Sequence, residues 1–227
     1  MQTALIEAAK KRAAILAVDK LKAAHLLGVG TGSTVFYFIE ELKKRSISLK
    51  AAFSSLNSHE LLKHSLITAI SNQDFISLDL TVDGADYIDE RGVLIKGGGG
   101  ALFREKILAY SSKRVLIIAD ETKLLKRSQT VKLPIEILPF GYQCTKAHLK
   151  EFKGNFRINP DGSLYLTDNQ NYIFDALVEF PIQDPKKLHQ NLKAIPGVVE
   201  TGLFYDLPFE LIVAPLDPKQ PIKEWRV

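Results

Sequence analysis

The sequence predicts an α/β fold in which a doubly wound, mostly parallel sheet is combined with an inserted, smaller ferredoxin-like α+β domain. Three observations lead to this prediction. Strand and helix patterns alternate through the first 125 residues, as in a chain of βαβ units. Residues 115–119 form a continuous apolar run, which is typical of a parallel strand covered on both faces. After Ser128 the elements follow a β-α-β-β-α-β order with one extra strand, close to that of a ferredoxin-like domain.

The first part of the chain contains the alternating elements. We expect helices at residues 3–21, 33–44, 59–65 and 101–111, with Ser58 as the cap of the third helix. We expect strands at residues 26–29, 50–53, 75–82, 93–95 and 115–119. In the strand at 75–82, apolar side chains alternate at Ile76, Leu78, Leu80 and Val82.

The second part of the chain is richer in strands. We expect strands at residues 133–138, 155–158, 163–166, 172–178 and 198–204, and helices at 145–152 and 185–195. Asn159-Pro160-Asp161-Gly162 is a strong turn signal. A final strand at 210–214 can rejoin the first sheet, which would make the small domain an insertion. We therefore expect a Rossmann-like domain from residues 1–128 and 206–227, and a small α+β domain from residues 129–205.

Composition narrows the possible partners and location. The 227 residues carry a net charge of +4, which suits anionic partners, but the lysines are scattered and no basic block suggests nucleic-acid binding. No apolar run reaches the roughly 18 residues that span a bilayer, and the N-terminal segment lacks the layout of a signal peptide. The single cysteine, Cys144, permits no intrachain disulfide and is interpreted as a packing residue. These observations favour a cytoplasmic protein.

The most informative segment is residues 96–106, where four consecutive glycines open a helical pattern. Such a run is costly in backbone entropy. The usual reason is a ligand that approaches bare backbone at a helix N-terminus, where free N–H groups favour an anion. Lys96 precedes the glycines and Glu105 follows one turn into the helix. This layout predicts a substrate that carries a phosphate or forms an oxyanion.

Glu105 is the sharpest single candidate for a catalytic group. Its helical neighbours at three and four positions, Ala101, Leu102, Leu108 and Ala109, are all apolar. Removal from water raises the pKa of a carboxyl group toward the range that suits a general base. The alternative is a carboxylate held in a salt bridge.

The charged neighbours of Glu105 have other interpretations. Arg104 and Lys106 fall on other faces of the helix, where we expect them to reach solvent, although Arg104 can help to hold an anion. Lys96 is either an exposed strand end or a cation that stabilises a negative oxygen. The sequence pattern leaves the alternatives for Lys96 open.

The first glycine-rich loop, residues 28–34, follows a strand and opens a helix. Its glycines permit a tight turn, and Thr31, Ser33 and Thr34 place hydroxyl groups beside free N–H groups, which makes a phosphate cradle. The loop lacks the third glycine of the dinucleotide-binding fingerprint and the Gly-Lys-Ser/Thr of a Walker loop. A plain strand-to-helix turn is the alternative.

Two further polar groups follow predicted strands. Asp83-Gly84-Ala85-Asp86 lies past the strand at 75–82, and its carboxylates can bind hydroxyls or move protons. A turn with a helix cap explains the same residues equally well. Lys123 follows the strand at 115–119 and either reaches a phosphate or is simply exposed.

The five histidines show no spacing typical of metal ligands, so we expect no metal site: His25, His59, His64, His148 and His189.

Taken together, the motifs resemble the ribose-5-phosphate isomerase family, type A. The resemblance rests on Gly30-Thr31-Gly32-Ser33-Thr34, Asp83-Gly84-Ala85-Asp86 and the run from Lys96 through Gly97-Gly98-Gly99-Gly100 to Glu105 and Lys106. It continues through residues 118–123, 133–136, 194–199 and 201–204, and so spans nearly the whole chain in order. The block from Lys96 to Lys106 is highly specific, whereas the first glycine loop alone is not.

The resemblance implies the interconversion of ribose 5-phosphate and ribulose 5-phosphate in the non-oxidative branch of the pentose phosphate pathway. It implies no metal or organic cofactor, a sugar phosphate as the small-molecule partner, and a homo-oligomer, either a dimer or a tetramer. Glu105 looks like the base that shuttles a proton through an enediolate, and Asp83 would assist ring opening. The other implied binding residues are Thr31, Gly32, Ser33, Thr34, Gly84, Ala85, Asp86, Lys96, Gly97, Gly98, Gly99 and Lys123, joined less strongly by Lys10.

Within that set the resemblance separates three tasks. Lys96 and the amides of 97–99 would hold the enediolate oxygens, and Asp86 would bind hydroxyls. Thr31, Ser33 and their neighbours would hold the phosphate end.

Two positions depart from the family pattern, and two other functions stay open. Tyr87 stands where the family commonly has glutamate, and Val35 replaces a small residue, which bears on substrate affinity more than on the reaction type.

One alternative is a non-catalytic sugar-phosphate sensor with an added DNA-binding helix pair, for which we expect no room in this chain. The other is an amino-sugar phosphate deaminase, which would need an Asp/His arrangement that the motifs lack.

Overall fold

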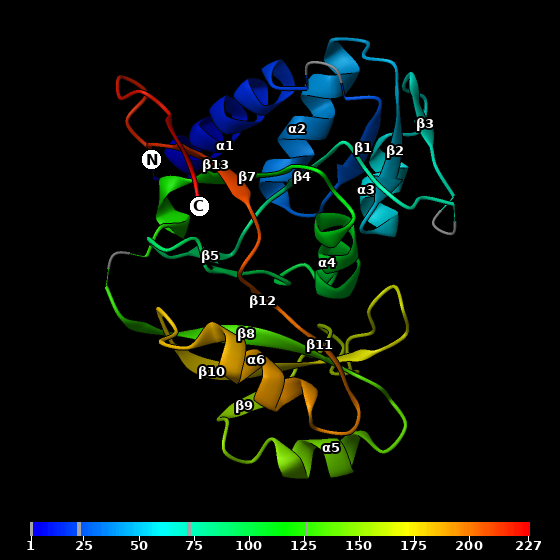
Figure 1. The fold of residues 1–227 in the computed structure, drawn as a ribbon, viewed down its shortest axis with the longest axis vertical. Coiled ribbons are helices and arrows are strands. Elements are labelled where there is room, and N and C mark those ends of the chain that lie inside the picture. The colour runs from blue at the N-terminus through cyan, green and yellow to red at the C-terminus, as the bar shows by residue number, and fades with distance from the viewer. Residues whose placement is uncertain (1, 22–23, 72–73, 126) are drawn as a thin grey trace. The chain divides into compact units, whose positions relative to one another are not determined.

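The computed structural model describes residues 2–21, 24–71, 74–125 and 127–227. The chain divides into two compact units, coloured along the chain in Figure 1. The larger unit comprises Met1–Ala85, Arg104–Leu124 and Leu207–Val227, and the smaller unit comprises Asp86–Phe103 and Leu125–Asp206. The domain boundaries expected from the sequence, at 128/129 and 205/206, stay a prediction about which parts of the chain fold independently.

The larger unit is built on a mostly parallel sheet. In the described part of the chain its strand order is β14-β13-β7-β4-β1-β2-β3. The strands are β1 (Leu26–Val29), β2 (Leu49–Phe53), β3 (Ile67–Ala69), β4 (Leu80–Asp83), β7 (Val115–Asp120), β13 (Phe209–Ala214) and β14 (Lys223–Arg226). Neighbouring strands are parallel except that β14 runs antiparallel to β13. The chain returns to this sheet as β13, which confirms the strand that the sequence placed there.

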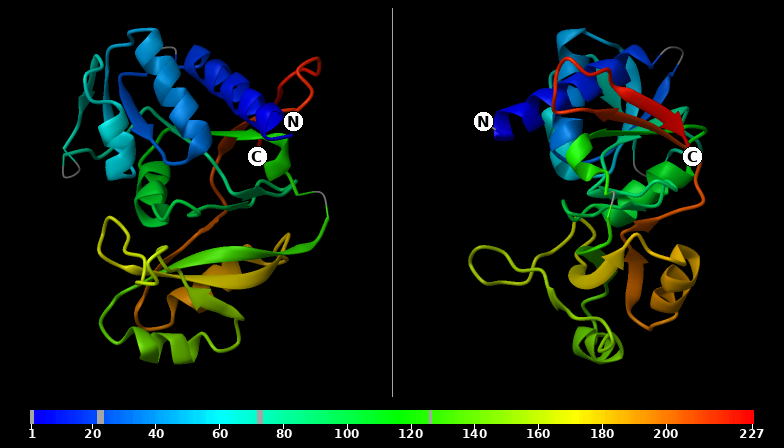
Figure 2. Two further views of the ribbon diagram at one scale, coloured as in Figure 1. Left: turned by 180° about the vertical axis from the view of Figure 1, so that it is seen from behind. Right: turned by 90° about the vertical axis from the view of Figure 1, so that its left-hand side faces the viewer.

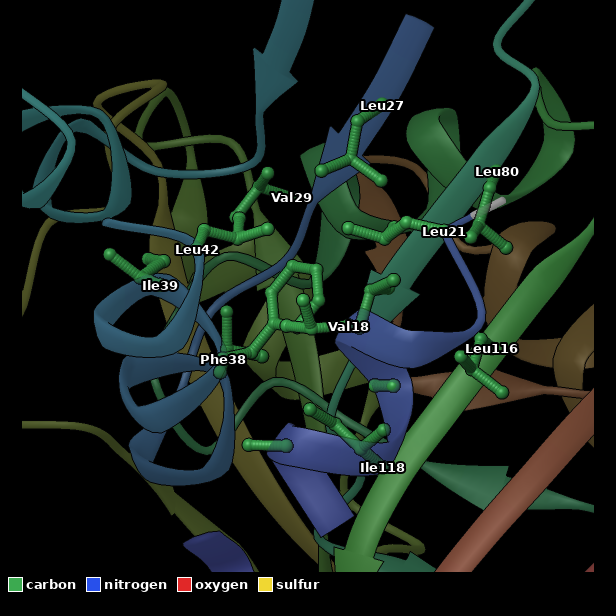
Figure 3. Packing of buried hydrophobic residues seen from close by; sticks show 14 of the residues in the cluster. Val18, Leu21, Leu27, Val29, Phe38, Ile39, Leu42, Leu80, Leu116 and Ile118 are labelled. Atoms are coloured by element: carbon green, nitrogen blue, oxygen red, sulfur yellow. The ribbon is translucent and has the colours of Figure 1, made fainter. Parts of the chain in front are cut away.

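Helices cover both faces of this sheet, as a doubly wound fold requires. The helices are α1 (Gln2–Asp19), α2 (Ser33–Lys44), α3 (Leu56–Leu61) and α4 (Leu102–Tyr110), with a 3₁₀ turn, η1 (Glu121–Lys123), after β7. Figure 3 shows Phe38 and Leu42 of α2 and Val18 of α1 against Leu27 and Val29 of β1. On the opposite face, Leu108 of α4 packs with Ala52 and Leu78.

Small residues set how closely α1 approaches its neighbours. Ala9, Ala13, Ala14 and Ala17 recur at helical spacing and are at most 1% exposed. Alanine side chains let a helix lie close to the layer beneath it, and α1 packs against α2, β7 and β13. The buried face of α1 therefore depends on small side chains rather than on large apolar ones.

The smaller unit contains the predicted ferredoxin-like arrangement. Its strands β8 (Gln129–Ile137), β9 (Gly154–Phe156), β10 (Tyr172–Phe180) and β11 (Val198–Thr201) form an antiparallel sheet in the order β11-β8-β10-β9. The helices α5 (Tyr142–His148) and α6 (Pro185–Lys193) belong to this unit (Figure 2). Leu149, just after α5, and Leu192 of α6 are fully buried in the same apolar cluster as Leu133 and Ile135 of β8. The fold class expected from the sequence is confirmed.

A second, short sheet in the smaller unit leads into the glycine run. It consists of β5 (Tyr87–Ile88), β6 (Leu94–Ile95) and β12 (Leu203–Phe204), in the order β12-β6-β5. Lys96 follows β6 directly, and its N–H donates to the carbonyl of Gly202 at 2.8 Å. This backbone bond holds the start of the glycine run beside the chain segment that precedes β12.

Several local predictions were wrong. The strand expected at 75–82 begins only at Leu80, and Ile76 is 94% exposed, so the apolar alternation did not mark a buried face. The helix α3 is capped by Ser55, whose side chain accepts a hydrogen bond from the N–H of Ser58. Cys144 is exposed in α5 and is not a packing residue.

Two edge strands of the larger unit's sheet were missed by the sequence analysis. β3 has only partly buried and exposed residues, and β14 consists of Lys223–Arg226 with a half-buried Trp225. Such strands are defined by backbone pairing to a neighbour and need no apolar alternation of their own. Across the residues that the structure describes, no helix is both long and apolar enough to cross a membrane.

Candidate active site

Gly28 in β1 and Gly30 in the loop after it both lie against side chains of the neighbouring strand β4. The N–H of Gly30 donates to the carbonyl of Val82 at 2.9 Å, which brings the loop against β4. A Cβ atom at Gly30 would lie 1.9 Å from Oδ1 of Asp83, and one at Gly28 would lie 2.0 Å from Oγ1 of Thr81. Both positions therefore require glycine for packing within the protein.

Asp83 is fixed at the carboxyl end of β4. Its side chain is 2% exposed, and its Oδ1 accepts hydrogen bonds from the N–H groups of Thr31 at 3.1 Å and Gly84 at 2.7 Å. From β1 the strand order continues to β2 and β3 on one side and to β4 and β7 on the other. The carboxyl ends of strands at such a switch point form the usual ligand crevice of an open α/β sheet.

The start of α2 presents polar groups at the same edge of the sheet. Its first intrahelical bond runs from the N–H of Phe36 to the carbonyl of Gly32, and among the described residues no side chain caps the helix. The preceding N–H groups of the first turn have no partner within the helix, which makes this end attractive to an anion. Ser33 is exposed and Thr34 is buried, while Oγ1 of Thr31 hydrogen-bonds Oγ of Ser54 at 2.7 Å.

Lys123 lies in η1, directly after the carboxyl end of β7. The half-buried lysine follows Asp120, which is fully buried and accepts hydrogen bonds from both the N–H and the hydroxyl of Thr122. Because β7 pairs with β4 in parallel, Lys123 and Asp83 belong to the same edge of the sheet.

Lys10 is engaged by another residue of α1. Its Nζ lies 2.7 Å from Oε1 of Glu7, whose other oxygen accepts from the hydroxyl of Tyr37. These two hydrogen bonds lower the pKa of Glu7. The structure thus gives Lys10 a carboxylate partner within the larger unit.

The apolar face predicted around Glu105 is present. Glu105 is 3% exposed, and Leu108 and Ala109 on the same helix are 2% and 4% exposed. Lys106 was expected to reach solvent, and that prediction was wrong, since it is 8% exposed. The position of a side chain on a helix does not by itself decide its exposure, because neighbouring parts of the chain can cover it.

Arg104 is half-buried and lines a pocket in the larger unit. The pocket has a volume of about 270 Å³ and lies where β2 and β3 end. Its other lining residues are Phe53, Ser55, Leu56, His59, Ala69, Ile70 and Ser71. The expectation that Arg104 helps to hold an anion stays a prediction.

In the smaller unit, Lys96 and the glycine run form a tight turn. The N–H of Gly100 donates to the carbonyl of Gly97 at 2.9 Å, and both residues have positive φ, +81° and +103°, which favours glycine. The N–H of Gly98 donates to Oδ2 of Asp86 at 2.7 Å. Lys96 is 3% exposed.

The sequence analysis missed two residues that bind this turn. Arg157 donates from Nη1 to the carbonyls of Gly97 and Gly98, at 3.0 Å each, and the hydroxyl of Tyr165 donates to the carbonyl of Gly99 at 3.3 Å. These residues flank the Asn159-Pro160-Asp161-Gly162 turn, which was recognised only as a turn. No local pattern connects them to glycines about sixty residues earlier.

Each unit therefore assembles its own share of the expected residues. The larger unit brings Asp83 to the loop at Thr31, and the smaller unit brings Asp86 to Gly98. Among the residues that the structure describes, no group of three or more His, Cys, Asp or Glu side chains could hold a metal ion.

Comparison with known proteins identifies the family. The family model described as ribose 5-phosphate isomerase A (phosphoriboisomerase A) matches residues 51–217. The chain belongs to this family. Ribose-5-phosphate isomerase A of Protochlamydia amoebophila is 42% identical over 210 residues, which cover 90% of each chain. That of Deinococcus radiodurans is 40% identical over 224 residues, or 96% of this chain and 98% of the relative.

Solved structures of ribose 5-phosphate isomerases have the same fold. The enzyme of Methanocaldococcus jannaschii is 28% identical with a TM-score of 0.86, covering 97% of this chain and 99% of the other. The Plasmodium falciparum enzyme is 33% identical with a TM-score of 0.85 and the same coverage. Another, at 33% identity and a TM-score of 0.86, was solved in complex with phospho-erythronic acid; the alignment covers 98% of this chain and 99% of that one. The resemblance noted from the motifs is confirmed for the family and the fold.

Proposed function

We propose that this chain interconverts ribose 5-phosphate and ribulose 5-phosphate, with Glu105 as the group that carries the proton. The observation that carries the proposal is the burial of Glu105, a carboxylate 3% exposed on the helix into which the glycine turn leads. A base for this reaction must be kept from bulk water, so that the proton it removes is returned to the substrate. Membership of the isomerase family supports the same assignment.

The reaction moves one proton between adjacent carbons. Glu105 removes the proton from C2 of the open-chain aldose, and the electrons of the broken C–H bond form the C1–C2 double bond of an enediolate. The aldehyde oxygen at C1 takes up the negative charge. The protonated Glu105 then delivers the proton to C1, while the C2 hydroxyl becomes the ketone and its proton passes to the negatively charged C1 oxygen. No redox partner is needed, because the substrate is oxidised at C2 and reduced at C1.

The enediolate oxygens need positive partners. We assign this role to Lys96 and to the amides of Gly97, Gly98 and Gly99, with Gly98 and Gly99 exposed at the tip of the turn. The N–H of Gly98 donates to Asp86, so a bound hydroxyl or oxyanion would share or replace that contact. Asp86 would then bind a substrate hydroxyl.

The ring form of the sugar must open before the proton moves. We assign this step to Asp83, whose position is set by the N–H groups of Thr31 and Gly84. It would remove the proton of the C1 hydroxyl as the bond from C1 to the ring oxygen breaks, and it would pass that proton to the ring oxygen, which becomes a hydroxyl group. The rigid hold on Oδ1 favours a constant position during this transfer.

The phosphate end would bind at the carboxyl edge of the larger unit's sheet. Thr31, Gly32, Ser33 and Thr34 offer hydroxyls and N–H groups at the start of α2, and Gly84, Ala85 and Lys123 complete the assignment. One solved relative binds phospho-erythronic acid, an acyclic sugar acid that carries a phosphate. That ligand has the features the two ends of this site would recognise.

We further propose that the protein works in the cytoplasm as a homo-oligomer, either a dimer or a tetramer, on a freely diffusing sugar phosphate. Light scattering after size-exclusion chromatography would give the molar mass, and a mass of one chain, 25.3 kDa, would contradict the oligomer. The relatives carry the isomerase name, so the sensor and the deaminase alternatives are not favoured.

The deciding experiment compares the purified chain with Glu105→Gln. Interconversion of ribose 5-phosphate and ribulose 5-phosphate is measured with a chelator present. We expect activity in the unaltered chain and a loss of at least ~10²-fold in the variant. Glu60→Gln, which removes an exposed carboxylate of α3 that pairs with Lys63, is the matched control and should keep full activity. Equal rates for Glu105→Gln and the control would refute the assignment of the base. An unaltered chain that is inactive on every phosphorylated aldose tested would favour the sensor.

A further inference from the structure

The glycine turn is bound from outside through its carbonyl groups. Arg157 donates to the carbonyls of Gly97 and Gly98, and Tyr165 donates to that of Gly99. The Tyr165 ring also lies so close that a Cβ atom at Gly100 would be 2.3 Å from its hydroxyl oxygen. The segment around 157–165 thus binds consecutive peptide groups of the turn, all within the smaller unit.

Arg157 is held in place by a second partner. Its Nε and Nη2 donate to the two carboxylate oxygens of Asp175, at 3.0 Å and 2.6 Å, in a bidentate pair. The side chains of Arg157 and Asp175 are 17% and 12% exposed, and the guanidinium lies 5.6 Å from the centre of the Tyr165 ring. A charge in such a partly buried, bidentate pair is far less mobile than a surface charge.

The carbonyls that Arg157 binds belong to the peptide groups whose N–H groups are those of Gly98 and Gly99. The carbonyl of Gly98 and the N–H of Gly99 are the two ends of one peptide group, and the carbonyl of Gly97 shares a peptide group with the N–H of Gly98. A cation at the oxygen draws electrons from the amide nitrogen, so the N–H becomes a stronger donor; hydrogen bonds in a chain reinforce one another in this way. These two N–H groups are two of the three amides assigned above to the enediolate.

We propose that Arg157 is a positioning residue for the isomerisation, which orients and polarises the amides of Gly98 and Gly99. The inference rests on the proposed function, because it acts on the reaction only through those amides. Polarised amides stabilise the reaction intermediate more than the substrate. The neutral sugar gains little from a more polarised N–H, whereas the negatively charged enediolate gains more, so the effect falls on the intermediate and on its analogues.

Arg91 provides a matched control within the same unit. It forms a pair with Asp89 through Nε and Nη2, and it donates to the carbonyls of Ile182 and Gln183. Arg91 and Arg157 therefore share the same chemistry, an arginine that joins one carboxylate to two consecutive carbonyls, but Arg91 does not contact the glycine turn. Arg91→Met controls for the general loss of such a link.

The experiment compares Arg157→Met, Arg157→Lys and Arg91→Met with the unaltered chain. The readouts are kcat and KM for ribose 5-phosphate and the inhibition constant of phospho-erythronic acid, whose planar carboxylate stands for the enediolate. We expect Arg157→Met to lower kcat about 10-fold or more while KM changes less than about 3-fold, and to weaken the inhibitor more than the substrate. Arg91→Met should leave the ratio of the inhibition constant to KM unchanged.

Each outcome bears on a different claim. If the unaltered chain is active and Arg157→Met behaves as Arg91→Met does, the inference is overturned while the proposed function stands. If the unaltered chain is inactive on ribose 5-phosphate, the proposed function fails first. If circular dichroism shows that Arg157→Met does not fold, Arg157→Lys decides. A lysine has no planar guanidinium and cannot bind both carbonyls and the carboxylate at once. The ratio of the inhibition constant to KM should therefore rise in Arg157→Lys as in Arg157→Met, but by a smaller factor. An unchanged ratio overturns the inference.

Discussion

Gly30 and Asp83 lie so close together that a methyl group at position 30 would be 1.9 Å from the carboxylate oxygen Oδ1. The contact joins the loop after β1 to the end of β4, at the switch point where the chain adds β2 and β3 on one side of β1 and β4 and β7 on the other. It leaves no room for a side chain, and the carboxylate cannot move away without losing the N–H groups of Thr31 and Gly84.

Gly30→Ala should therefore destabilise the protein. We expect a loss of about 1–3 kcal/mol in the free energy of unfolding, because the new methyl group overpacks a buried site. Urea denaturation would measure the loss. Gly84→Ala is the matched control, since its Cβ would lie 3.8 Å from the carbonyl oxygen of Thr31 and 3.9 Å from that of Ile118, which are ordinary contact distances. A Gly30→Ala protein as stable as the control would mean that the loop and Asp83 are not packed as described.

Asp79 should make stability depend on pH in the acid range. Its pKa is lowered to about 2, first by the hydrogen bond from Lys113 and then by those from the N–H groups of His25 and Leu26. Because the pKa is lower in the folded state, the stabilisation is present above the unfolded pKa of about 4 and is lost as the pH falls toward 2. Lys113 is largely exposed, so we expect a contribution of only about 1 kcal/mol.

Asp79→Asn tests this dependence. At pH 7 the variant should unfold at lower urea concentration than the unaltered chain. The difference between their midpoint urea concentrations should become smaller from pH 4 to pH 2. A gap that is constant over this range would show that the charge of Asp79 does not stabilise the fold.

Asp120 should matter for substrate affinity through Lys123. The carboxylate is fully buried and caps η1 by accepting from the N–H of Thr122, so its removal should loosen the turn that carries Lys123. For Asp120→Ala we expect KM for the sugar phosphate to rise about 5-fold, which corresponds to roughly 1 kcal/mol, with a smaller change in kcat. Thr122→Ser keeps the N–H and a hydroxyl and should keep KM. A fall in kcat alone would place Asp120 in the chemical step instead.

Cys144 should react readily in the native protein. It is exposed in α5, and it is the chain's one cysteine, so a thiol reagent should label one group per chain without denaturant. Because α5 contributes none of the residues assigned to the reaction, labelled protein should keep its activity. Slow labelling that requires denaturant would show that another surface covers α5 in solution.

Parts of this protein were readable from local sequence. The strand β1 and the helix α2 begin and end where the apolar pattern predicts, and β7 is recognised by its unbroken run of buried apolar residues. The burial of Glu105 also follows from local sequence, since its neighbours one turn away on α4 are apolar. Helical periodicity and β-rich runs act over a few residues, so a sequence displays them directly.

Other parts depended on contacts that a linear pattern does not contain. The sequence predicted Ser58 as the cap of α3, but the cap is Ser55, because the helix begins at Leu56, about one turn earlier than the helical pattern suggests. Lys106 is buried although its place on the helix predicted exposure, because packing over α4 decides its environment. The edge strands β3 and β14 exist through pairing with β2 and β13.

By itself the sequence determined the fold class and the family, and it marked the glycine-rich segments to which we assign the chemistry, because glycine runs and apolar periodicity reflect backbone sterics and burial within a few residues. Only the tertiary structure decided why individual glycines are required and what holds the glycine turn. Gly30 makes room for Asp83, and the carbonyl of Gly98 meets Arg157 from 59 residues further along the chain. Such contacts form between strands and loops that folding brings together, and their distances are set by the packing of whole elements rather than by any spacing in the sequence.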